Sequence, residues 1–122
     1  MAEGLARHFG SDVIEVYSAG IKPTGVVSED AIEIMRELKI DISKQRSKGL
    51  LDVPVKDMDI VISMAPRPAL QLVPRDFRGR TVDWRVDDPV GKSLTVFRRV
   101  RSELDVLVKQ LVEDVRRRPP ID

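Results

Sequence analysis

The stretch Val86–Leu104, "VDDPVGKSLTVFRRVRSEL", contains the clearest structural signal in the chain. A turn rich in acidic residues, proline and glycine leads directly into a long helical pattern. Hydrophobic residues then recur at spacings of three and four, which places them on one stripe of a helix. The members of this stripe are Phe97, Val100, Leu104, Leu107, Leu111 and Val115. The sequence therefore predicts a C-terminal amphipathic helix with one face packed on a core.

Helical and strand patterns alternate along the rest of the chain. Apolar spacing and capping signals predict helices over 1–9, over 28–39 with Ser28 as N-cap, and around 47–51. Runs of β-branched and aromatic residues predict strands over 12–18, 59–64 and 80–86. Three prolines limit 66–74 to one helical turn.

This alternation predicts an α/β fold, a three-layer sandwich around a mostly parallel sheet, in a single domain over residues 1–122. With 42% hydrophobic and 34% charged residues, the composition is that of a folded globular protein. No apolar run approaches the roughly 20 residues of a membrane span, and the first residues contain no signal-peptide core. We therefore expect a cytoplasmic protein with no membrane partner.

Charge and cysteine content exclude several classes of site. The net charge of +1 gives no indication of nucleic-acid binding. The chain has no cysteine, which excludes disulfides, thiolate metal sites and cysteine nucleophiles within these residues. His8 is the only histidine, too little for a zinc site and the only imidazole available to a serine hydrolase. We expect neither a cofactor nor a metal.

Three stretches, taken in order, carry a resemblance to a known family. They are "MAEGLARHF" with "YSAG", then "MRELKIDISKQRSK", then "VDDPVGKS" with "FRRVRSEL". Together they resemble the low-molecular-weight protein tyrosine phosphatases and their arsenate reductase branch, from residue 1 to about residue 115. The resemblance implies a phosphotyrosine protein phosphatase I-like fold and a phosphotyrosine or other oxyanion ligand. In the family, a cysteine nucleophile hydrolyses a phosphate ester or reduces arsenate.

The resemblance also implies which parts of that site are present. In the family a first strand leads into a Cys-x5-Arg loop whose backbone N–H groups and arginine hold an oxyanion. Met1 resembles the start of the helix that follows this loop, so we expect the first strand, the loop and the nucleophile to be missing. Asp88, directly before Pro89, resembles the general acid that protonates the leaving oxygen. Without the resemblance, Asp-Pro followed by Gly is a turn that starts the long helix.

Two further interpretations follow from the resemblance. Arg46 in "SKQRSK" resembles a basic position of the family and is either a ligand-binding residue or a solvated loop charge. The arsenate reductase branch needs two more cysteines between the 59–64 strand and Asp88, and that stretch has none, which excludes a thiol relay. We therefore expect a chain that is inactive as it stands; the alternative is a non-catalytic anion-binding or regulatory module on the same scaffold.

A missing first strand has a consequence for the sheet. In the family this strand is central, so its loss leaves unpaired backbone groups on both neighbours, at a cost of roughly 1–3 kcal/mol for each buried group. We therefore predict that the strands over 12–18 and 59–64 pair directly, or that the exposed sheet edges pair across a homodimer.

Overall fold

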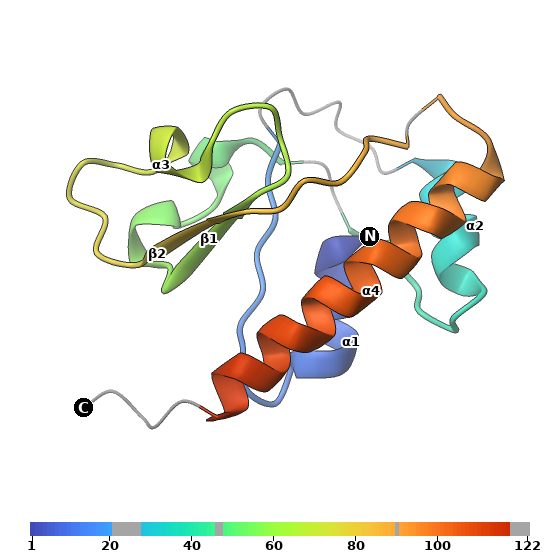
Figure 1. Cartoon of the computed structure of the whole chain (residues 1–122), viewed down its shortest axis with the longest axis horizontal. Helices are drawn as coiled ribbons and strands as arrows, with labels where there is room; N and C mark the ends of the chain where they lie inside the picture. The colour runs from blue at the N-terminus through green and yellow to red at the C-terminus, as the bar shows by residue number, and fades with distance from the viewer. Residues whose placement is uncertain (21–27, 46–47, 90, 118–122) are drawn as a thin grey trace.

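The computed structural model describes residues 1–20, 28–45, 48–89 and 91–117 (Figure 1). Four α-helices, two short 3-10 helices and two strands follow one another within these residues. Their bounds are α1 Ala2–Gly10, α2 Glu29–Arg36, η1 Leu50–Asp52, η2 Val55–Asp57, β1 Ile60–Ser63, α3 Ala69–Leu72, β2 Arg80–Asp83 and α4 Leu94–Arg117.

The core lies where α1 and α2 pack against α4, away from the sheet (Figure 1). Its largest fully buried side chains are Phe97, Leu5, Ile34, Met35, Ile42, Val100 and Val108. The predicted C-terminal helix is confirmed, and its first stripe residues are buried as expected. Farther along, Val108 and Val112 are buried, whereas Leu107 and Leu111 are only half-buried. The buried face of α4 therefore shifts by one residue in this part of the helix, because α1 packs against the side that carries Val108 and Val112.

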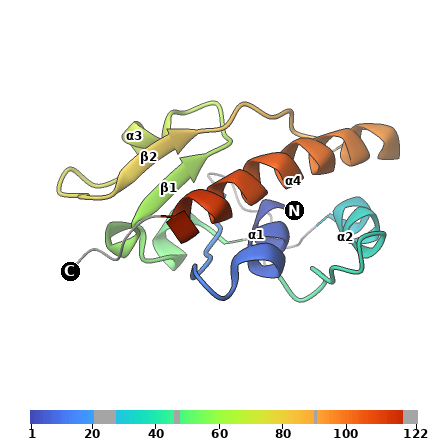
Figure 2. The same ribbon diagram turned by 60° about the horizontal axis from the view of Figure 1, so that its bottom comes forward.

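The strands predicted over 59–64 and 80–86 are confirmed in shortened form as β1 and β2. They pair in parallel from Ile60 opposite Arg80 to Ser63 opposite Asp83, in a two-stranded sheet. The predicted helical turn between them is α3, which lies on the side of the sheet away from α4 in both views (Figures 1 and 2). The α/β class and the parallel sheet are therefore confirmed.

The strand predicted over 12–18 is wrong. Residues 14–19 are extended but belong to no ladder, and the only pairing nearby is an isolated parallel bridge between Gly20 and Gly49. Direct pairing of this segment with 59–64 is wrong for the same reason: within the described residues β1 pairs with β2 alone. A β-rich sequence becomes a strand only when a neighbouring backbone accepts its hydrogen bonds.

The remaining helices differ from the predictions mainly at their ends. The helix over 1–9 is confirmed as α1. The helix predicted over 28–39 ends at Arg36, because the chain turns at Lys39 with φ 62° and the Ile40 amide donates to the Met35 carbonyl. Ser28 stands at the N-cap position, but its hydroxyl makes no capping hydrogen bond. The short helix predicted around 47–51 is the 3-10 turn Leu50–Asp52, and Ser47 lies outside the described residues.

Candidate functional site

The carboxyl ends of β1 and β2 meet at one edge of the sheet, where parallel α/β folds usually bind ligands. The side chain of the last residue of each strand, Ser63 in β1 and Asp83 in β2, makes hydrogen bonds to the loop between β1 and α3 or to the first residue of α3. The Ser63 hydroxyl donates to the Arg67 carbonyl at 2.7 Å and accepts from the Ala65 amide at 3.2 Å. Asp83 Oδ1 accepts from the Ala69 amide at 2.8 Å, at the start of α3. These contacts tie the loop between β1 and α3 to the sheet edge.

The segment from Trp84 to Ser93 leaves β2 at the same edge and leads to α4. Trp84 and Val86 are half-buried and pack against the helical core. The Asp87 carboxylate pairs with the Arg99 guanidinium, with 2.6 Å between Oδ2 and Nη2. The segment is thereby attached to the sheet, to the core and to α4 before it reaches the helix.

Asp88 is exposed on this segment. The turn that follows it is built as the sequence indicates: the Lys92 amide donates to the Pro89 carbonyl at 2.9 Å, and Gly91 has φ 79°. The Ser93 carbonyl then accepts the amides of Val96 and Phe97 and starts α4. The turn interpretation is confirmed, and the role of Asp88 as a general acid stays a prediction. Arg46 lies outside the described residues.

Sequence reasoning missed a polar network that holds the extended segment on α1. Glu3 is buried, with 7% of its surface exposed, and its carboxylate accepts from Arg7 Nε at 3.0 Å and from the Ser18 hydroxyl. Arg7 Nη2 also donates to the Val16 carbonyl at 2.8 Å. The only sequence signal was the spacing of Glu3 and Arg7, which are four residues apart and therefore neighbours on a helix.

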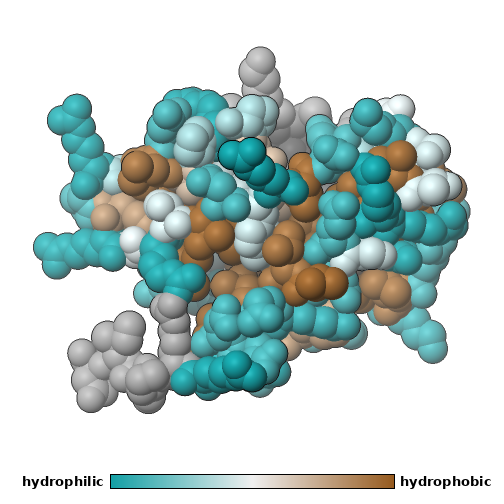
Figure 3. Space-filling view, in the orientation of Figure 1, coloured by the Kyte–Doolittle hydropathy of each residue, from teal (hydrophilic) through white to brown (hydrophobic). Residues whose placement is uncertain are grey.

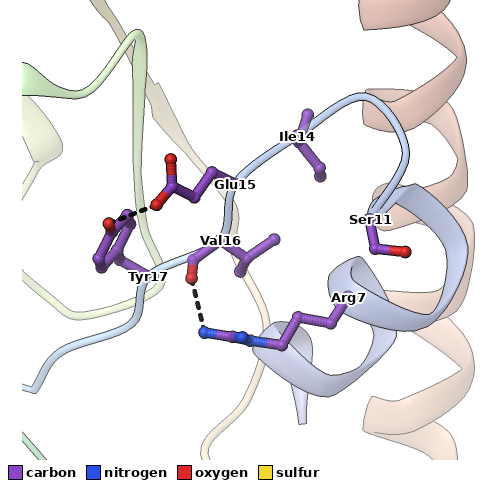
Figure 4. Close-up of a pocket in the computed structure, with 6 residues that line it drawn as sticks. All are labelled: Arg7, Ser11, Ile14, Glu15, Val16 and Tyr17. Carbon is purple, nitrogen blue, oxygen red and sulfur yellow. Dashed lines mark hydrogen bonds between the residues drawn. The ribbon is translucent and has the colours of Figure 1, made fainter.

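A shallow, open cavity of about 360 Å³ lies beside the same segment (Figure 4). Its lining consists of Arg7, Ser11, Ile14, Glu15, Val16 and Tyr17. At its rim the Tyr17 hydroxyl donates to a Glu15 carboxylate oxygen at 2.6 Å, and this contact raises the pKa of Tyr17. Tyr17 and Glu15 are thus engaged with each other, and Arg7 is engaged with the Val16 carbonyl.

The chemistry open to the described residues is limited. The sequence contains no cysteine, and the part of the chain that the structure describes holds no cluster of three or more metal-ligating side chains. The His8 ring lies edge-on against Phe9, 4.9 Å between ring centres. None of the helices described has the length and low charge needed to cross a bilayer.

Comparison with known proteins identifies the family of the chain. The sequence profile described as "Low molecular weight phosphotyrosine protein phosphatase" matches residues 1–120. An arsenate reductase of Staphylococcus aureus (strain Newman) is 34% identical over 109 residues, which cover 89% of this chain and 82% of that protein.

Two solved structures are similar to the whole described fold. An arsenate reductase in the phosphate-binding state superposes with a TM-score of 0.80 at 34% identity, over 93% of this chain and 86% of that one. A low-molecular-weight protein tyrosine phosphatase from T. tengcongensis gives 0.79 at 28% identity, over 93% and 88% of the two chains. The chain belongs to the low-molecular-weight phosphotyrosine protein phosphatase family, which its arsenate reductase relatives share.

Proposed function

We propose that the carboxyl edge of the sheet is the oxyanion-facing site of this chain and that Asp88 is its general acid. The observation that carries the proposal is that the Asp88 segment leaves the sheet at that edge, where the Trp84 amide donates to the Ser63 carbonyl at 2.9 Å, and is held to α4 by the Asp87–Arg99 pair. A carboxylic acid group at this place can donate a proton to the leaving oxygen of a phosphate ester.

These 122 residues contain no thiol, so we propose that by themselves they neither hydrolyse phosphate esters nor reduce arsenate. Arsenate reduction by a thiol relay would also need cysteines between β1 and Asp88, and residues 64–87 contain none. Although two of the three similar proteins reported above are named arsenate reductases, a phosphate ester therefore fits this chain better than arsenate does.

An activity assay on purified chain tests both parts of the proposal. We expect no hydrolysis of an aryl phosphate above a blank, and no arsenate reduction when thioredoxin and its reductase are supplied. Asp88→Asn and Asp87→Asn form a matched pair. Hydrolysis that is lost in Asp88→Asn and kept in Asp87→Asn would refute inactivity while supporting the general acid.

Phosphate titration, followed by NMR chemical shifts, tests the alternative that the chain is a non-catalytic anion-binding module. Saturable shifts confined to the segment from Trp84 to Pro89 and the loop after Ser63, without turnover, would support an anion-binding module on this scaffold. If phosphate leaves both regions unchanged at concentrations well above physiological levels, the sheet edge is not an oxyanion site in this chain.

A further inference from the structure

Two arginines lie at the carboxyl edge of the sheet, one after each strand. Arg67 is in the loop after β1, and its carbonyl accepts from the Ser63 hydroxyl at 2.7 Å. Arg85 directly follows Trp84, whose amide donates to the Ser63 carbonyl at 2.9 Å. Figure 1 shows that the chain leaves both strands on the same side of the sheet. The buried Ser63 therefore ties the backbone beside both arginines to the end of β1.

The side chain of Arg85 is on the face of the sheet that carries α3. Trp84 and Val86, on either side of it, pack against the helical core. Successive side chains of an extended chain point to opposite faces. Asp83, two residues before Arg85, accepts from the first amide of α3. Arg85 is exposed and therefore projects on the α3 face.

Arg67 is exposed on the same face, two residues before α3, and its backbone is restricted. Pro66 and Pro68 flank it. A proline fixes its own φ and also confines the residue before it to extended conformations. The hydrogen bond from the Ser63 hydroxyl restricts this loop further. An arginine on such a backbone loses little additional freedom when it binds a ligand.

Neither arginine is neutralised by a carboxylate of the described chain. All five arginines of α4 form ion pairs with Asp or Glu side chains. Arg67 and Arg85 form none among the described residues. Two acidic side chains of the same edge are already engaged, Asp83 with α3 and Asp87 with α4. The edge thus presents two exposed guanidinium groups that can bind an anion.

The chemistry of these groups indicates the kind of ligand. A guanidinium group binds carboxylates and phosphates through its paired N–H donors. The proposed function assigns a phosphate ester to this edge, so a second anionic group of the same ligand would meet Arg67 and Arg85. A small aryl phosphate has no such group, whereas a phosphopeptide can carry carboxylates on both sides of its phosphorylated residue.

We propose that Arg67 and Arg85 form a subsite for an acidic side chain of the ligand. The ligand is then a phosphopeptide with glutamate or aspartate beside the phosphorylated residue. This inference rests on the proposed function, because it takes the phosphate group to lie at the same edge. Exposed ion pairs contribute little each and are screened by salt, so we expect about a three- to fivefold preference over a neutral phosphopeptide.

Titration of the full chain with three blocked peptides tests the subsite. The first has phosphotyrosine flanked by glutamates, the second has phosphotyrosine flanked by glutamines, and the third has the glutamates but no phosphate. Trp84 is the only tryptophan of the chain and adjoins Arg85, so its fluorescence reports binding. The amide chemical shifts of Arg67 and Arg85 give a second readout. We expect the preference for glutamates at low salt, and its loss at about 1 M salt, where charges are screened beyond about 3 Å.

Two double variants with the same change of charge locate the effect. Arg67→Gln with Arg85→Gln should bind the two phosphopeptides equally. The matched control is Arg75→Gln with Arg78→Gln, in the loop between α3 and β2. Both of these arginines are exposed, and Figure 3 shows long hydrophilic side chains projecting from this part of the molecule. Because the loop enters β2 at the opposite end of the strand, the control should keep the preference.

The outcomes separate the subsite from the proposed function. Equal binding of the two phosphopeptides by the parent chain would overturn the subsite and leave the phosphate site in place. An equal loss of preference in both double variants would also overturn it, in favour of a general charge effect. Equally tight binding of the glutamate peptide with and without phosphate, lost only in Arg67→Gln with Arg85→Gln, would refute the proposed function and support the subsite. If neither glutamate peptide binds, the subsite is overturned.

Discussion

Two acidic residues of this protein, Asp87 and Glu3, are held in different surroundings. Asp87 is paired with Arg99, whereas Glu3 is buried on α1 between Arg7 and Ser18. A surface ion pair contributes little to stability, but removal of one partner from a buried network leaves the others without hydrogen bonds. Glu3 is thus the acid on which the position of the extended segment most depends.

Replacement of this residue, Glu3→Ala, should lower the free energy of unfolding by about 1–3 kcal/mol, because it removes the hydrogen bonds that the buried carboxylate accepts from Arg7 and from the Ser18 hydroxyl. Urea denaturation measures the change. The matched control is Glu33→Ala on the exposed face of α2, which we expect to have a much smaller effect. Equal losses in the two variants would show that the Glu3 network does not hold the segment.

At the scale of elements, α1 and α4 approach closely at Gly10. A Cβ placed on Gly10 would lie 2.7 Å from Val112 Cγ2 and 2.9 Å from Ile14 Cδ1. Alanine favours a helix over glycine by up to about 1 kcal/mol, while overpacking of a core costs about 1–3 kcal/mol. The close approach should therefore outweigh the helix preference.

The variant Gly10→Ala should consequently destabilise the protein. Val112→Ala removes the nearest methyl group, so the double variant should lose less stability than the sum of the two single losses. Urea denaturation of the four proteins in this cycle gives the coupling. Strict additivity would mean that α1 and α4 adjust without strain.

A second tie between elements joins α2 to α4. Glu37, at the end of α2, accepts from Arg98 and Arg101 at 2.7 and 2.8 Å, and Arg101 also donates to the Ile34 carbonyl. Hydrogen bonds from Arg98 and then Arg101 lower the pKa of Glu37 from 4.5 to about 2. A lowered pKa means that the folded state favours the charged carboxylate.

Stability from Glu37 should therefore be fully present above pH 4.5 and lost as the pH falls through about 2. At neutral pH, Glu37→Gln should melt at a lower temperature than the parent chain, and the gap should close over that acidic range. Thermal melts followed by circular dichroism measure it. Glu103→Gln is the control, since the Glu103–Arg99 pair is separated by 4.0 Å. A gap independent of pH would show that packing, rather than charge, ties the two helices.

Across the whole molecule, the core and the sheet are buried to different degrees. Ile34 on α2 is fully buried, whereas Ile62 on β1 is half-buried and outside the core cluster. Truncation of a buried aliphatic side chain to alanine costs about 2–5 kcal/mol, and less where neighbours are few. The helical part should therefore determine the stability of the chain.

The comparison of Ile34→Ala with Ile62→Ala tests this expectation by urea denaturation. We expect the larger loss for Ile34→Ala, and a loss for Ile62→Ala well below that range. A larger loss for Ile62→Ala would mean that the sheet, and not the helical core, limits stability.

Local signals in the sequence were enough for most elements. The spacing from Phe97 to Leu104 predicted α4, the apolar run after Asp59 predicted β1, and prolines restricted α3 to one turn. The Asp88–Pro89 turn was also predicted, because its residue types specify their own backbone conformation. The family followed from the order of three motifs and is confirmed by the profile match over residues 1–120.

The pairing of extended segments that lie far apart in the chain could not be predicted from the sequence alone. Residues 12–18 have strand composition, but a strand exists only where another backbone completes it, and the structure decided that none does within the described residues. The burial of Glu3 likewise depends on Ser18, which lies far along the chain and is brought there by the tertiary fold. The helices, the two paired strands and the family were predictable from the sequence, since their signals lie in residues close together in the chain. Which extended backbones pair became known only from the folded structure, because hydrogen bonds between segments depend on their positions in space.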